Sequence, residues 1–220
     1  MLNIVLAAAL AALGQDAQPA ATPAVAPVAT GPALEQIPGV TVNYYDVAGK
    51  NDKELRASID QQRPKNAAGQ PITAGTSWII DASISKQTTD GVCKITSVTP
   101  NFKGTAVLPR LTTADKLKPE MLVQWNKYSD GLKTAAAEQL NFVRGRLGDV
   151  QTAVGAAACD QAAAALDASL EKLKTQEAAF LAQQAAARTA EEQRLMAERE
   201  AAAKAAKEKG ENASYDPKSE

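Results

Sequence analysis

Residues 76–88, TSWIIDASISKQT, carry the clearest structural pattern in the chain. Apolar side chains occupy every second position and therefore share one face: Trp78, Ile80, Ala82 and Ile84. Ser83, Ser85 and Gln87 point the other way. Because successive side chains of a strand alternate between its two faces, this pattern predicts a half-buried β-strand.

Neighbouring segments extend this strand into a sheet. Asp90-Gly91 is a strong hairpin signal, so a return strand is expected that ends near Pro100, followed by a separate strand over residues 102–108. Residues 40–47, VTVNYYDV, are β-branched and aromatic and predict another strand. Together these segments predict a small antiparallel sheet.

Helical periodicity replaces the strand pattern from Pro119. Apolar residues recur at three- and four-residue steps as far as Leu147, and a second apolar stripe follows Asp160 to about Leu181. The predicted fold class is therefore α+β, with the small antiparallel sheet packed on two long antiparallel helices. Beyond Arg188, Ala, Glu, Lys and Arg dominate, which predicts that the C-terminal helix extends into solvent.

The two ends of the chain differ in composition from its middle. Residues 1–17 resemble a secretory signal peptide, and residues 18–38 form an Ala/Pro-rich linker. Residues 39–187 form the predicted α+β domain, 188–209 a charged Ala-rich helix extension, and 210–220 a disordered tail. We therefore expect a periplasmic or secreted protein with no transmembrane segment in its mature chain. Retention of the apolar start as a membrane anchor is the alternative.

Charge and residue counts exclude several classes of protein. The 24 basic and 25 acidic residues leave a net charge of −1, which does not favour nucleic acid as a partner. The chain contains no histidine, so catalytic triads and histidine-dependent metal sites are excluded. Cys93 and Cys159 are expected to form a disulfide if the protein is exported, and two buried free thiols are the alternative.

Four sequence blocks, in this order, resemble one bacterial family. They are Tyr44-Tyr45-Asp46-Val47 with residues 49–59, then Thr76 and Trp78, then residues 93–98 with 108–110, and finally Trp125-Asn126-Lys127-Tyr128 with Leu132. The blocks resemble the domain-of-unknown-function family of predicted secreted zinc-dependent proteases, over roughly residues 40–190. This resemblance implies an α+β fold, export and a disulfide.

The resemblance also implies a metal motif that this chain lacks. The family's His-Glu-x-x-His motif would fall on Ala135, Ala136 and Gln139, with a further histidine near Ala186. Histidines at i and i+4 of a helix can both bind Zn²⁺, but alanine has no lone pair and a glutamine carbonyl is a poor zinc ligand. We therefore expect no metal, no cofactor and no catalytic residues at this degenerate site. The small residues should let the second long helix close over part of it.

These observations predict an exported, catalytically inactive protease-like protein with a binding or structural role in the bacterial envelope. Its expected partner is an envelope protein or peptide that the sequence does not identify. One alternative is a carboxylate-dependent hydrolase of cell-envelope substrates, for which Asp46 and Asp81 are a candidate pair. Another is an assembly protein that acts through its C-terminal helix as a coiled coil, although no sustained heptad follows Phe180.

Overall fold

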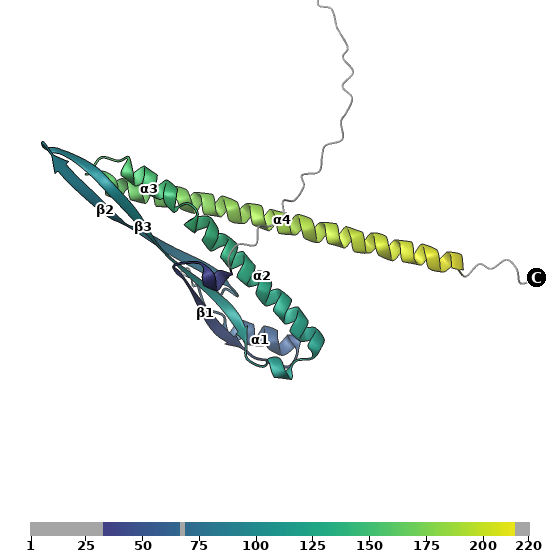
Figure 1. Cartoon of the computed structure of the whole chain (residues 1–220). Coiled ribbons are helices and arrows are strands. Elements are labelled where there is room, and N and C mark those ends of the chain that lie inside the picture. The colour runs from purple at the N-terminus through teal and green to yellow at the C-terminus, as the bar shows by residue number, and fades with distance from the viewer. Residues whose placement is uncertain (1–32, 67–68, 214–220) are drawn as a thin grey trace, which may run out of the picture. The chain divides into compact units, whose positions relative to one another are not determined.

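The structure is a computed structural model that describes residues 33–66 and 69–213, all within one compact unit. Its strands are β1 (Val40–Val47), β2 (Gly75–Thr89) and β3 (Val92–Leu111), and its α-helices are α1 (Asp52–Gln62), α2 (Pro119–Arg144), α3 (Leu147–Gly155) and α4 (Ala162–Ala213) (Figure 1). The 3-10 turns η1 (Leu34–Gln36) and η2 (Ala114–Lys116) precede β1 and α2. The small sheet and the long C-terminal helix confirm the predicted α+β class.

Both ends of the chain extend beyond the described residues. The predicted signal peptide, most of the linker and residues 214–220 lie outside the described residues. Among the helices that the structure describes, none has the length and apolar character needed to cross a bilayer.

The sheet is mixed, so the prediction of an antiparallel sheet was wrong in part. Strand order is β1-β3-β2, with β2 antiparallel to β3 and β1 parallel to β3, from Val40 opposite Gly104 to Val47 opposite Leu111. The chain passes through α1 between β1 and β2, and such a connection allows β1 to lie parallel to β3. Alternation in the sequence reports which face of a strand is buried, but not the direction of the neighbouring strand.

The predicted hairpin is confirmed at Asp90 and Gly91, which both have positive φ, 53° and 77°. This is the backbone of a tight two-residue turn between antiparallel strands. The predicted break at Pro100 is wrong, because β3 continues through it to Leu111. At Pro100 the strand pairs with β2 alone, since its pairing with β1 begins at Gly104, and a proline is tolerated where only one side of a strand is hydrogen-bonded.

The predicted apolar face of β2 is turned toward the helices. Ile80 is buried, whereas Ile79, on the opposite face, is 66% exposed. On the buried face, α2 packs against β3 through Leu140 and Leu108, and α3 packs against it through Val150 and neighbouring residues. The central part of the core therefore lies between this face of the sheet and the helices that cover it in Figure 1.

The core begins earlier in the chain than the sequence predicted. Leu34 and Ile37 fall in the predicted linker, yet each is only 2% exposed and packs with Leu140 and Ala136 of α2. The backbone N–H of Val40 donates to the carbonyl of Ile37, which leads the chain directly into β1. The last residues of the predicted linker are thus folded, because two large apolar side chains find a place against α2.

Glycine and short loops divide the helices differently from the prediction. The first long helix ends at Arg144 with Gly145 as its cap, and the separate helix α3 follows from Leu147 to Gly155. Its buried side chains pack beside Val98 of β3. At the other end, α4 continues to Ala213 and passes through Gly210, beyond the predicted end of the helix at residue 209.

The predicted disulfide between Cys93 and Cys159 is confirmed. It joins the start of β3 to the turn between α3 and α4. Beside it, the Lys86 ammonium donates to the Cys159 carbonyl oxygen at 2.6 Å. The end of the hairpin is therefore tied to the helical layer both covalently and by a charged hydrogen bond.

Removing the disulfide tests its contribution to stability. We expect Cys93→Ser with Cys159→Ser to lower the free energy of unfolding by about 2–4 kcal/mol, because the bridge restricts the unfolded chain over a separation of 66 residues. Urea unfolding of the two proteins measures the difference. The wild type unfolded in the presence of a reductant should match the double variant, and equal stability with and without the bridge would contradict the expectation.

Core packing on α2 can be tested with a matched pair of leucines. Leu140→Ala should cost roughly 2–5 kcal/mol, because Leu140 is 0% exposed and its removal leaves a cavity against β3. Leu195→Ala in α4 should change stability by less than about 0.5 kcal/mol, since Leu195 is 41% exposed. Similar losses in the two variants would show that the described core is incorrect.

Candidate functional site

The three positions that the sequence analysis assigns to a degenerate motif line one cavity. Ala135, Ala136 and Gln139 face it from α2, and its volume is about 250 Å³. The rest of the wall comes from the start of β2, from other residues of α2 and from α4: Ala74, Gly75, Thr76, Leu132, Glu138, Phe180, Leu181, Gln184, Ala185 and Arg188. The structure therefore brings these predicted positions to a single site where a strand and two helices meet.

Small side chains on α2 make room for this cavity. Ala135 is half-buried, and Ala136 is only 6% exposed because it also packs in the core with Leu34 and Ala106. Ala186, the predicted position of the further histidine, is exposed and does not line the cavity, although Ala185 does.

A carboxylate that the sequence analysis missed lies beside the motif. Glu177 of α4 accepts hydrogen bonds from Trp78 Nε1 and from Gln139 Nε2, each at 2.8 Å. It stands among apolar residues of α4, between Leu173 and Phe180 at helical spacing. A charge within an apolar stripe was the available signal, since a partly buried carboxylate requires hydrogen-bond donors.

The cavity is closed at one side and charged at its edge. Phe142 of α2 stacks on Phe180 of α4, with ring centroids 4.4 Å apart and an interplanar angle of 15°. Arg188 and Glu138 approach to 3.9 Å, a loose ion pair between the same two helices. The prediction that the second long helix covers part of this face is consistent with these contacts, but an open volume remains between them.

One polar atom in this wall has no partner. The Thr76 hydroxyl oxygen is buried and makes no hydrogen bond to any residue that the structure describes. A buried hydroxyl without a partner is unfavourable by about 1–3 kcal/mol. This oxygen is shielded from the cavity, so it is a polar group that the local packing of β2 leaves unsatisfied.

The cavity wall combines apolar surface with a few polar groups. Within the described residues, no group of three or more Cys, Asp, Glu or His side chains could hold a metal ion. Both oxygens of Glu177 are already hydrogen-bonded, and the motif positions supply no imidazole. The wall itself offers apolar surface and the charged pair of Glu138 and Arg188, and Glu177 lies next to it on Gln139.

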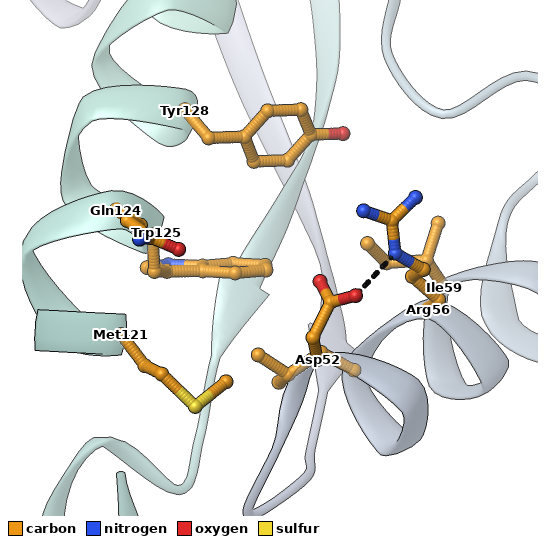
Figure 2. A pocket seen from close by; sticks show the side chains of 8 residues that line it. Asp52, Arg56, Ile59, Met121, Gln124, Trp125 and Tyr128 are labelled. Carbon is orange, nitrogen blue, oxygen red and sulfur yellow. Dashed lines mark hydrogen bonds and ion pairs between the residues drawn. The ribbon is translucent and has the colours of Figure 1, made fainter. Parts of the chain in front are cut away.

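A second cavity, of about 280 Å³, lies between α1 and the start of α2 (Figure 2). Its inner wall includes Trp125, whose ring meets Tyr128 edge-on with centroids 5.8 Å apart. The ion pair between Asp52 and Arg56, at 2.7 Å, lies at its opposite wall. Burial raises the pKa of Tyr128, so its hydroxyl stays protonated at neutral pH. Trp125 lines this cavity and also packs in the core with Val47 and Leu55.

The candidate carboxylate pair is not brought together. Asp46 of β1 pairs with Arg110 at 2.7 Å, whereas Asp81 of β2 accepts from Asn101 at 2.9 Å. Arg110 and Asn101 are nine residues apart along β3, which separates the two carboxylates by about 30 Å at the rise of a strand. Asp46 and Asp81 therefore cannot act as an acid and base on one substrate.

The fold and the site define a small α+β protein with an open cavity at a helix crossing and no metal-ligand set in its wall. The chain belongs to the family described as "Bacterial protein of unknown function (DUF922)", whose model matches residues 42–187. No curated protein and no solved structure matches the chain. The matched region includes β2, β3, all of β1 except its first two residues, and every residue of the cavity wall except Arg188.

Zinc binding provides a direct test of the prediction that this site is a degenerate metal motif. The wild type should hold no stoichiometric Zn²⁺ in elemental analysis, since Ala135 and Ala136 offer no ligand atoms. The variant Ala135→His with Ala136→Glu and Gln139→His should hydrolyse no casein. It should also be less stable by roughly 1–3 kcal/mol, because the new carboxylate at position 136 would be buried without a partner.

Glu177 supplies the control for this variant. The contrary result has two parts. The triple variant would bind zinc tightly and hydrolyse casein, and adding Glu177→Gln to it would abolish the zinc binding. The cavity would then be a masked metal site. That result would contradict the interpretation of the cavity as non-catalytic. Ala135→His alone should leave stability nearly unchanged, because this position is half-buried and faces the open volume.

Proposed function

We propose that this protein is an exported, catalytically inactive protease-like protein that binds another protein or a peptide in the bacterial envelope through the cavity at Ala135 and Gln139. The observation that carries the proposal is the open volume of about 250 Å³ at the degenerate motif. A purely structural role would favour close packing of α4 on this small-residue face of α2. An open cavity favours a binding role.

The chemistry of the wall favours a polypeptide as the ligand. Phe180 and Leu181 offer apolar surface, and the side-chain amide of Gln184 can donate and accept hydrogen bonds. Arg188 and Glu138 place both signs of charge at the edge, which suits the mixed polarity of a peptide better than a strongly charged polymer. Pockets that bind ligands commonly combine apolar walls with a few such polar groups.

Location in the envelope rests on two independent features. The apolar start of the chain is typical of a secretory signal, and the Cys93–Cys159 disulfide is compatible with an oxidising compartment. We therefore propose a periplasmic or secreted protein. A binding role requires that the fold and the cavity are kept, but it does not require catalytic residues.

Site-specific photo-crosslinking tests the binding role. A photoreactive benzoylphenylalanine at position 181 should form discrete adducts in the native bacterium, because Leu181 lies at the cavity wall and is 40% exposed. The same group at position 123 is the matched control, since Val123 is more exposed and lies on α2 outside this cavity. Ala135→Trp should remove the adducts by filling the cavity.

Three results separate the possibilities. Adducts at position 181 that disappear with Ala135→Trp support binding in the cavity. Identical adducts at positions 181 and 123 would indicate non-specific contact, and the proposal would fail. Adducts that persist with Ala135→Trp would place the partner elsewhere, provided that the variant keeps the melting temperature of the parent.

A further inference from the structure

The second half of α4 has no packing partner in the described chain. Gln184 is its last half-buried residue, and every described side chain from Ala185 to Lys207 is exposed. Near its start, Arg188 forms a loose ion pair with Glu138 of α2 at 3.9 Å. The helix nevertheless continues for another 25 residues, to Ala213.

Local interactions account for helix formation without tertiary packing. Arg194 donates to Glu191 one turn before it and to Glu198 one turn after it, each at 2.6 Å. The hydrogen bond from Arg194 lowers the pKa of Glu191, so this pair stays charged at neutral pH. Exposed pairs are individually weak, but alanine has the highest helix propensity and separates the charges throughout this segment.

The surface of this segment is poorly suited to docking. Its large apolar side chains are Leu195 and Met196, which are consecutive and so point in directions about 100° apart around the helix. A stripe that packs on a partner needs apolar residues at three- and four-residue spacing. Residues 185–213 also contain six basic and six acidic residues, so no net charge draws them to a membrane or a nucleic acid.

We infer that residues 185–213 form a free-standing helical spacer that holds the residues following Ala213 away from the cavity. The segment starts at the cavity wall with Ala185 and lies almost entirely beyond the region that defines the family. From Ala185 to Ala213 the helix rises by 28 residues at about 1.5 Å each, so its two ends are about 42 Å apart. Glu200-Ala-Ala-Ala-Lys204 has the sequence pattern of semi-rigid helical spacers.

This role is independent of what the cavity binds. The spacer fixes how far any residues after Ala213 reach from the folded part. The inference would stand even if the cavity proved to have only a structural role.

Distance measurement by electron spin resonance tests the spacer in the full chain. Spin labels at Ala182→Cys and Ala206→Cys, both exposed, should give one narrow distance near 36 Å, from 24 residues at about 1.5 Å each. Ala197→Pro between them is the control, because it breaks the helix and should broaden the distribution. A broad distribution without the proline would overturn the inference.

Two further measurements distinguish a spacer from a docked helix. Ending the chain at Arg188 should leave the melting temperature within about 2 °C of the full chain, since the removed side chains are exposed. A clear loss of stability would show that the segment packs on the domain. Concentration-dependent association, or a second distance that disappears on dilution with unlabelled protein, would show docking on another copy and would also overturn the inference.

Discussion

Packing of α2 against the central strand β3 is the contact on which the rest of the structure depends. Leu140 of α2 and Leu108 of β3 are almost completely buried where the two elements meet. Ala136 lies one helical turn before Leu140. Around this contact, η1 adds Leu34 from one side of α2 and α4 packs from the other. Since fully buried aliphatic contacts contribute most to a small core, this pair fixes where both flanking segments can lie.

The far end of the sheet needs its own support. The hairpin extends past the region covered by α2, and a separate cluster of Val98, Val150, Val154 and Ala162 packs there. These side chains are small, so they bury less area than the leucines near α2. The adjacent Cys93–Cys159 disulfide offsets this smaller burial, because it limits the conformational freedom of the unfolded chain and so stabilises the folded state.

The cavity exists because polar contacts fix the position of α4 where it crosses α2. Small residues at 135 and 136 would permit the two helices to approach closely. Glu177 instead bridges Trp78 and Gln139, and the Phe142–Phe180 stack fills the neighbouring position. Moving α4 closer would break hydrogen bonds to a partly buried carboxylate, which is unfavourable, so the volume beside Ala135 remains open.

Local patterns in the sequence were sufficient to predict the fold class and several of the secondary-structure elements of this protein. Alternation around Ile80, the Asp90-Gly91 turn and the apolar stripe of α2 each depend on neighbouring residues, so they predicted the α+β class. The four sequence blocks that resemble a bacterial family also pointed to Ala135 and Gln139, which the fold places at one cavity. The parallel direction of β1, the burial of Leu34 and the contact of Glu177 with Trp78 join residues far apart in the chain. Such contacts depend on how complete elements pack together, and no local period or propensity encodes them.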